Sequence, residues 1–281
     1  MQTKLRQLYQ RLQNLDPTQL SVAIGFDGFV DEIVEVVDRR QSFDSYTRMA
    51  NMRQFGERIS NAAGLSTNIE FVPKTMKLGG NGPIMGNALV KAGTGVSYVG
   101  SLGYPNIHPV FTELTDGCTQ VFSVAEPGHT DAVEFDDGKV MLGKMESLND
   151  VNWAMLQKEV GDEQLKRIFG GADLVATVNW TMTPYMNEIW AGLLDLCSPY
   201  PDGYLPFFFV DLADPSKRSP GDICEALEVI GRFSTYYRVI LGLNRKEASE
   251  IASVRGLTLS KPVEDADLEE IVRALGADLG L

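Results

Sequence analysis

Residues 77–93 read KLGGNGPIMGNALVKAG, and the other informative motifs of the chain are arranged around this stretch. Gly79, Gly80, Asn81 and Gly82 separate a β-like run (69–76) from a helix-like run (84–92). Glycine allows a sharp backbone turn and the close approach of a small molecule. Pro83 suits the first turn of a helix, where its missing N–H is not needed and the free N–H groups point at the loop. The stretch predicts a strand, a ligand-contacting loop and a helix, although a glycine cluster alone is also typical of an ordinary turn.

Apolar segments of strand length alternate with amphipathic segments of helix length along much of the chain. The pattern predicts helices over 4–15, 46–63, 83–93, 107–115, 152–169, 184–196, 221–233, 245–254 and 265–275, and strands over 21–26, 33–38, 95–101, 173–178, 207–212 and 238–243. Such alternation favours βαβ units, and therefore an α/β fold with a mainly parallel sheet covered by helices on both faces.

The middle of the chain has a different pattern. Residues 120–124, 131–135 and 140–142 are short and β-rich, and the sequence DDGK at 136–139 is typical of a hairpin turn. We expect a small β lid built from strands at about 30–40, 68–76 and 119–143, which closes over the loops at one edge of the main sheet.

The composition excludes several classes of protein. The chain has 281 residues, 44% of them hydrophobic, and a formal net charge of −13, which argues against a nucleic-acid partner because phosphates require a basic surface. No apolar run approaches the length of a membrane helix, and the N-terminus lacks the apolar core of a secretion peptide, so we expect a cytoplasmic protein with no membrane partner. Three scattered cysteines and two histidines predict neither a disulfide framework nor a zinc site based on them.

Polar residues follow the predicted strands at the points where the strands end. In an open parallel sheet, ligands bind beyond the carboxyl ends of the strands. A strand-end Asp or Asn is also common as a turn residue or helix cap. The residues that we expect in a polar ring at this edge are Asp27, Asp31, Asn179, Asp211, Asp214 and Asn244.

Five motifs, in this order, resemble those of the PfkB (ribokinase-like) family of carbohydrate kinases. They read AIGFDGFVD (23–31), KLGGNGPIMGNALVKAG (77–93), VSYVGSLG (96–103), VDLADPSKR (210–218) and LGLNRKEA (241–248). The resemblance extends from about residue 21 to residue 252. It implies one ribokinase-like domain over 1–281, a three-layer α/β/α sandwich with a small β lid. It also implies Mg²⁺-dependent transfer of the ATP γ-phosphoryl group to a sugar or sugar-like hydroxyl.

The resemblance also implies a sugar side of the site. Asp31 stands where the family has an aspartate that accepts hydrogen bonds from sugar hydroxyls, a role that suits a charged acceptor. The Gly79-Gly80-Asn81 loop matches the loop that receives the sugar. Asp27 and Asn179 complete the expected substrate-binding set. Many members have Ala-Asn where this chain has Pro-Ile at 83–84, which leaves the identity of the sugar open.

On the nucleotide side, Asn244 and Glu247 match the Asn-x-x-Glu motif, which the resemblance connects with Mg²⁺ and phosphate, with Glu247 acting through water. The same pair also fits a helix capping box that requires no ligand. Asp214 lies in a segment similar to Asp-Pro-Asn-x-Arg, with a role in shaping the nucleotide side, although a plain turn explains it equally well.

The family's catalytic base lies in a late Gly-Ala-Gly-Asp segment, and none follows residue 244. We therefore expect no catalytic base in this chain, which looks C-terminally truncated and weakly active or inactive. The alternatives are a non-catalytic sugar-binding or regulatory protein of the same fold, and an ADP-dependent sugar kinase. The resemblance also allows a homodimer formed through the lid. A dinucleotide-dependent enzyme is disfavoured because no GxGxxG follows the first strand.

Overall fold

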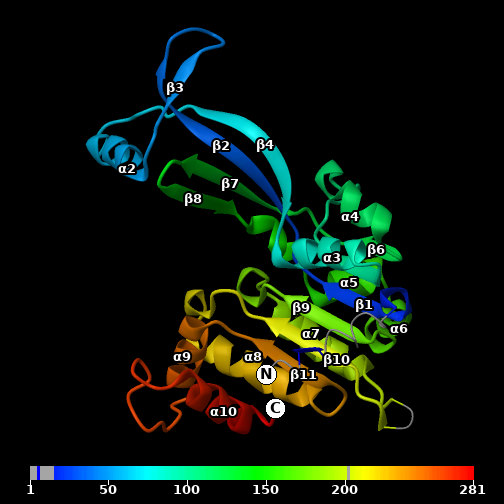
Figure 1. Cartoon of the computed structure of the whole chain (residues 1–281). Helices are drawn as coiled ribbons and strands as arrows, with labels where there is room; N and C mark the ends of the chain where they lie inside the picture. The colour runs from blue at the N-terminus through cyan, green and yellow to red at the C-terminus, as the bar shows by residue number, and fades with distance from the viewer. Residues whose placement is uncertain (1–4, 7–15, 201–202) are drawn as a thin grey trace.

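The central sheet of the protein has six parallel strands in the order β11-β10-β9-β1-β5-β6 (Figure 1). The structure is a computed structural model that describes residues 5–6, 16–200 and 203–281. The strands are β1 (Ser21–Gly25), β5 (Gly95–Gly100), β6 (Gln120–Ser123), β9 (Leu174–Val178), β10 (Phe207–Asp211) and β11 (Arg238–Gly242). The predicted α/β class with a mainly parallel sheet is confirmed.

Helices lie on both faces of this sheet because side chains alternate between the faces along each strand. In β1, Val22 and Ile24 join one apolar cluster and Ala23 joins the other. The first cluster includes side chains of α3 (Asn81–Lys91) and α4 (Thr112–Gly117). The second is built by α5 (Trp153–Glu159), α6 (Asp162–Gly170), α7 (Met186–Leu196), α8 (Pro220–Phe233), α9 (Arg245–Val254) and α10 (Leu268–Leu279). These are the three layers of the predicted sandwich.

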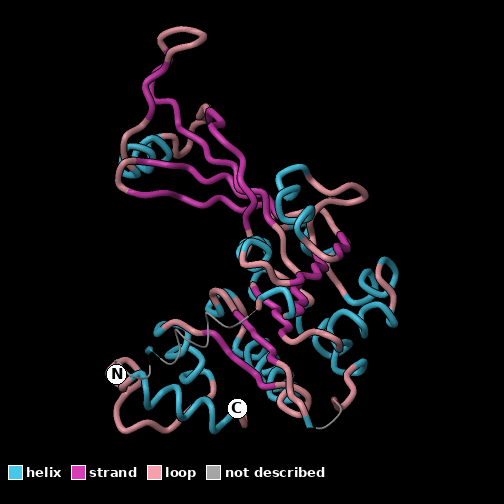
Figure 2. Tube along the Cα trace, turned by 45° about the vertical axis from the view of Figure 1, so that its right-hand side comes forward, coloured by secondary structure: helices cyan, strands magenta, loops and turns pink. Residues whose placement is uncertain are grey.

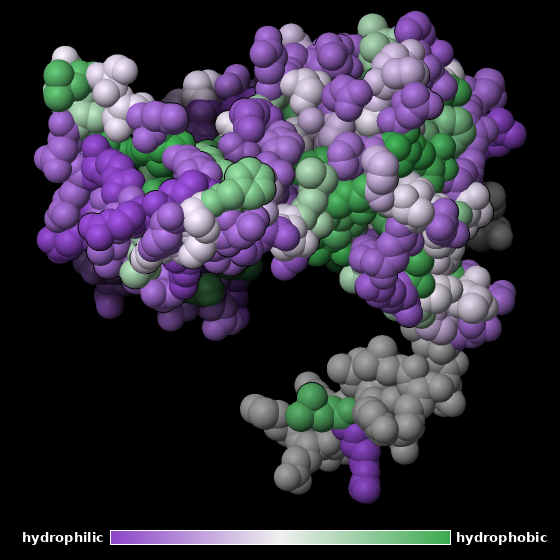
Figure 3. All heavy atoms as spheres, turned by 90° about the horizontal axis from the view of Figure 1, so that it is seen from above, coloured by the Kyte–Doolittle hydropathy of each residue, from purple (hydrophilic) through white to green (hydrophobic). Residues whose placement is uncertain are grey.

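A second sheet, which we call the lid sheet, projects away from this body (Figures 1 and 2). Its strands are β2 (Phe29–Arg40), β3 (Tyr46–Arg48), β4 (Phe71–Gly79), β7 (Gly128–Phe135) and β8 (Gly138–Lys144). β2 pairs antiparallel with β3 and β4 and parallel with β7, and β7 and β8 form the hairpin predicted around 136–139. The helix α2 (Met52–Asn61) packs Phe55 into an apolar cluster with residues of β2 and β7. Seen from above, the surface is mostly hydrophilic, with hydrophobic residues gathered in patches between the polar ones (Figure 3).

The lid prediction was wrong for residues 120–124. The strand β6 pairs with β5 at the edge of the central sheet, with Ser97 opposite Gln120, and the Gln120 Nε2 donates to Ser97 Oγ at 3.2 Å. A short β-rich run fixes the strand but not the sheet that it joins, because the free edge of β5 and the edge of a lid offer the same backbone groups.

Several predicted helices also had wrong bounds; α4, for example, begins at Thr112 and not near residue 107. The helix expected over 46–63 begins at Met52, where Asn51 caps it, and Tyr46–Arg48 instead pair with β2. The helix expected over 152–169 divides into α5 and α6, because Gly161 has a φ of 84° that interrupts a right-handed helix. The helix expected over 4–15 lies outside the described residues, apart from residues 5 and 6.

Candidate functional site

Asp27, directly after β1, is fully buried beneath the glycine loop. Its carboxylate accepts hydrogen bonds from the N–H of Asn81 and of Gly82, both at 2.9 Å, and from Asn179 Nδ2 at 2.8 Å. The two N–H groups belong to the first turn of α3, which lacks a side-chain cap of its own. Asp27 therefore caps α3 from a distant strand and holds the loop in place.

The surroundings of Asp27 raise the pKa of its carboxyl group. Burial raises the pKa of the Asp27 carboxyl to about 6, and the three donated hydrogen bonds oppose this rise. The Tyr98 hydroxyl donates to the Asp27 carbonyl oxygen at 2.6 Å. Asn179 adopts a left-handed conformation with a φ of 61°, which turns its amide toward Asp27. Asp27 and Asn179, both predicted to bind substrate, thus lie together under the loop and hold it in place.

Asn81 lies at the mouth of the site and is exposed. Its Nδ2 donates to Asp211 Oδ2 at 2.6 Å, at the carboxyl end of β10. The other carboxylate oxygen of Asp211 accepts the Ala213 N–H at 3.1 Å. The loop and the strand end therefore meet at the edge of the sheet where ligands bind in open α/β folds.

Asp31 on β2 lies directly over the glycine loop, as the sugar-site prediction requires. A Cβ placed on Gly79 would lie only 2.4–2.6 Å from the Asp31 carboxylate atoms. The contact arises because Phe29 and Gly79 are register partners in the β2–β4 ladder, which places Asp31 diagonally opposite Gly79 on the same face. Asp31 is half-buried, and this burial raises the pKa of its carboxyl, while Thr130 on β7 opposes the rise. A free carboxylate edge next to bare backbone is suited to accept hydroxyl protons.

The other two glycines of the loop are required by close contacts. Gly80 has a φ of 91°, and a Cβ on it would lie 2.8 Å from Asp27 Oδ2. A Cβ on Gly82 would lie 2.3 Å from the Tyr98 hydroxyl and 2.6 Å from Asp27 Oδ1. These distances are below any normal carbon–oxygen contact, so both positions require glycine.

The predicted nucleotide side shows the capping arrangement. Asn244 Oδ1 accepts the Glu247 N–H at 3.1 Å, and Glu247 Oε2 accepts the Asn244 N–H at 2.9 Å. Asn244 Nδ2 also donates to the other oxygen of Glu247. The pair forms a capping box at the start of α9, the alternative that the sequence left open.

Asp214 lies beside the same helix start. It accepts a hydrogen bond from the Ser216 hydroxyl at 2.7 Å and lies 3.2 Å from Lys246 Nζ, and these contacts lower the pKa of its carboxyl. Lys217 Nζ lies 3.7 Å from the same carboxylate. The loop after β10 and the N-terminus of α9 therefore place Lys217 and Lys246 around the Asp214 carboxylate.

The structure thus assembles the predicted residues into two groups. One group is the set predicted for the sugar, namely Asp27, Asp31, Gly79, Gly80, Asn81 and Asn179, and the other is the set predicted for the nucleotide, namely Asp214, Asn244 and Glu247. Tyr98 and Thr130 were not predicted, because an isolated Tyr or Thr in a strand has no sequence pattern that distinguishes it from a core residue. None of the described helices combines the length and the apolar character that a membrane span requires.

Comparison with known proteins decides the family. The profile of the prokaryotic ketohexokinase family matches residues 6–277. The chain belongs to this family. Over 238 residues it is 31% identical to the ketohexokinase of Haloferax volcanii, covering 84% of this chain and 63% of that protein. This member of the ketohexokinase family thus spans less than two thirds of the length of that relative.

Solved structures of sugar kinases share the fold. The ribokinase of Arabidopsis thaliana, complexed with ribose and ATP, superposes with a TM-score of 0.54 and 16% identity, covering 95% of this chain and 69% of that one. A carbohydrate kinase from Agrobacterium tumefaciens superposes with a TM-score of 0.55 and 13% sequence identity, covering 94% of this chain and 68% of that one. The resemblance to the PfkB family and the ribokinase-like fold, both predicted from the sequence, are therefore confirmed for this ketohexokinase-family chain.

Proposed function

We propose that the protein is a sugar kinase that transfers the γ-phosphoryl group of Mg·ATP to a hydroxyl of a ketohexose. The observation that carries this proposal is the position of the Asp31 carboxylate over the bare backbone of Gly79. Membership of the prokaryotic ketohexokinase family and the name of the Haloferax volcanii relative support a ketohexose as the acceptor.

In this proposal, the sugar lies between the lid sheet and the glycine loop. Asp31 accepts hydrogen bonds from two sugar hydroxyls, which are short and directional because the acceptor is charged. Asn81 and Asp211, which are connected by a hydrogen bond of 2.6 Å, lie at the entrance of the site. They offer one amide and one carboxylate to the remaining sugar hydroxyls. Asp27 and Asn179 act from below, since they fix the loop without reaching the sugar themselves.

The nucleotide side has donors that suit Mg·ATP. Magnesium is usually held by one or two carboxylates and several waters. Both oxygens of Glu247 accept hydrogen bonds from Asn244, and their remaining lone pairs would accept hydrogen bonds from such waters. Lys246 and Lys217 would bind phosphate oxygens in place of Asp214. Mg·ATP, when bound, supplies the phosphoryl group and neutralises its charge. The residues of the chain position the hydroxyl in line and exclude water by closure of the lid sheet.

The sequence contains no Gly-Ala-Gly-Asp segment, so no residue of these 281 is proposed as the catalytic base. We therefore infer that the chain binds the sugar and transfers phosphoryl groups weakly. The same feature supports a second candidate function, a sugar-binding protein without catalysis. The three free cysteines fit the reducing cytoplasm, which is the proposed location.

A homodimer through the lid sheet is also part of this proposal. Met76 on β4 and Leu142 on β8 are 44% and 39% exposed, and apolar side chains on an open sheet favour contact with a second subunit. Sedimentation of the lid variant Met76→Glu, Leu142→Glu should show a monomer under conditions in which the unmodified chain is dimeric.

The function is tested by an acceptor screen with radiolabelled ATP or ADP, in parallel with calorimetric titration of each sugar. The sugars are fructose, ribose, 2-keto-3-deoxygluconate, phosphorylated hexoses and nucleosides. We expect fructose to bind with the highest affinity. Binding of fructose without any transfer supports the non-catalytic candidate, transfer from ADP alone supports an ADP-dependent kinase, and a preference for nucleosides contradicts the proposed acceptor.

A further inference from the structure

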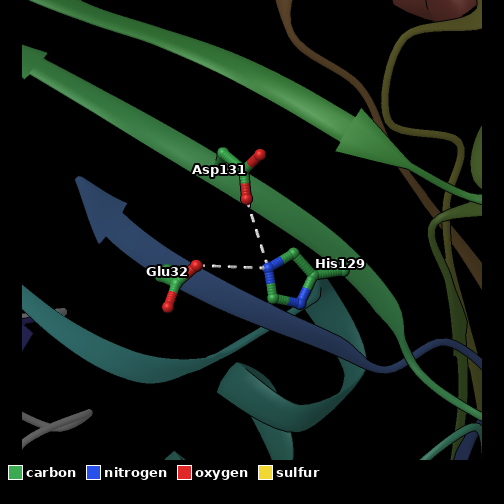
Figure 4. A group of neighbouring side chains, drawn as sticks. All are labelled: Glu32, His129 and Asp131. Carbon is green, nitrogen blue, oxygen red and sulfur yellow. Dashed lines mark ion pairs between the residues drawn. The ribbon is translucent and has the colours of Figure 1, made fainter. Parts of the chain in front are cut away.

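Three side chains of the lid sheet form a group that the sugar and nucleotide sites do not use. Among the described residues, Glu32 on β2 and His129 and Asp131 on β7 each offer one ligand atom, and these atoms lie within 4.8 Å of one another. Figure 4 shows both carboxylates turned toward the Nε2 atom of His129. We propose that this group binds a divalent transition-metal ion, with Zn²⁺ as the probe.

The pairing of the strands creates this group. Glu32 and Asp131 are register partners in the parallel β2–β7 ladder, and His129 is two residues before Asp131, so all three share one face. Asp31 and Thr130 are also register partners, and they point to the opposite face. The proposed metal site and the proposed sugar contact therefore lie on opposite faces of the same two strands.

The separations of the ligand atoms match those around a metal ion. His129 Nε2 lies 3.2 Å from Asp131 Oδ1 and 3.7 Å from Glu32 Oε2. Two ligands at the usual zinc distances of about 2.0–2.1 Å in a tetrahedral site are about 3.4 Å apart. The two separations from His129 Nε2 are within a few tenths of an ångström of that value, and all three ligand atoms lie within 4.8 Å of one another.

The chemistry of the three donors selects the class of ion. One imidazole nitrogen with two carboxylates suits Zn²⁺, Mn²⁺ or Fe²⁺, whereas Mg²⁺ and Ca²⁺ prefer all-oxygen sites. The side chains are only 25% (Glu32), 34% (His129) and 18% (Asp131) exposed. Three protein ligands at a partly buried surface leave one position for water, as in open zinc sites.

Lys144 on β8 forms an ion pair with Asp131, one of the three proposed ligands. Its Nζ lies 3.0 Å from Asp131 Oδ2 and donates to Oδ1 at 3.1 Å. The Lys144 side chain is 62% exposed, so it can turn into solvent, and an exposed ion pair contributes little to stability. The ammonium group therefore competes with the metal without blocking it.

The test is calorimetric titration of the metal-free 281-residue chain with ZnCl₂ and, separately, with MgCl₂, near neutral pH. We expect one Zn²⁺ per chain and much weaker binding of Mg²⁺. His129→Gln and Asp131→Asn should each weaken Zn²⁺ binding by at least about tenfold, because the loss of an outer-shell partner alone typically costs about 10- to 100-fold. Lys144→Met should tighten Zn²⁺ binding, an effect that misfolding cannot produce.

Two variants serve as matched controls. Glu35→Gln removes a carboxylate from the same strand whose ion-pair partners are Arg48 and Lys74, with no histidine among them. His108→Gln removes the other histidine of the sequence. Both should bind Zn²⁺ as the unmodified chain does. Equal Zn²⁺ affinity in the unmodified chain and His129→Gln, equal affinity for Mg²⁺ and Zn²⁺, or no gain in Lys144→Met would each overturn the proposal. None of these Zn²⁺ and Mg²⁺ titrations depends on kinase activity.

Discussion

The Asp27 carboxylate accepts a hydrogen bond from Asn179 at 2.8 Å, although the two residues are 152 positions apart in the sequence. This contact joins the end of β1 to the end of β9 beneath the glycine loop. Because Asp27 also holds the first two N–H groups of α3, one buried carboxylate connects three elements of the site. The position of the loop therefore depends on a group that does not reach solvent.

The buried Asp27 predicts a pH dependence of stability. Its pKa of about 6 in the folded chain lies above the ordinary value of 3.8, so its stabilising contribution is fully present below pH 4 and is lost as the pH rises through 6. We expect urea unfolding to show that the free energy of unfolding of the wild type, minus that of Asp27→Asn, falls by about 3 kcal/mol between pH 4 and pH 7. A difference that is constant or increases with pH would contradict the buried environment.

Close contact at Gly79 predicts a loss of sugar affinity on substitution. Gly79→Ala places a methyl group against the Asp31 carboxylate, which must move away from its position over the loop. Fructose affinity measured by calorimetry should fall by about tenfold or more, in the range of overpacking costs of about 1–3 kcal/mol. Gly56→Ala in α2 is the control, because a Cβ there has no neighbour within 4 Å. Equal losses in both variants would show that the effect is not local.

The capping box at α9 allows its structural and metal roles to be separated. Asn244→Ala removes the cap and should lower the free energy of unfolding by about 1 kcal/mol. Glu247→Gln keeps a side chain that can complete the box, so its stability should change little. If Glu247 also arranges Mg²⁺, then ATP binding by Glu247→Gln, measured by calorimetry, should require a severalfold higher Mg²⁺ concentration. An unchanged Mg²⁺ dependence would leave the motif as a helix cap only.

The sequence predicted five of the six strands of the central sheet, because each of these five has an apolar run long enough to be buried on both faces. It also predicted which residues meet at the sheet edge, since Asp27 and Asn179 follow parallel strands and Asp211 ends one. It could not predict which of these side chains face a ligand and which hold the start of a helix. Whether a strand-end carboxylate faces a ligand or a helix start depends on the tertiary positions of backbone groups such as the Asn81 and Gly82 N–H, which no local pattern encodes.

The errors have local physical reasons. β6 was assigned to the lid because the run at 120–124 precedes two strands that do belong to the lid. It pairs instead with the edge strand β5, and this pairing depends on the path of the chain between the two strands. The break between α5 and α6 was missed because Gly161 is compatible with a continuous amphipathic pattern, and only its φ of 84° ends the helix. The start of α2 was placed too early because Tyr46–Arg48 pair with a strand that the sequence had predicted as shorter.

The central claim is that Asp31, over the Gly79 backbone, binds the sugar. The most direct measurement is calorimetric titration of the wild type and Asp31→Asn with fructose and with Mg·ATP, with Glu35→Gln on the same strand as the control. We predict that Asp31→Asn weakens fructose binding by about 10- to 100-fold, the loss expected for hydrogen bonds to a charged group, while Mg·ATP binding and the Glu35→Gln control stay unchanged. Unchanged fructose affinity in Asp31→Asn would contradict the account.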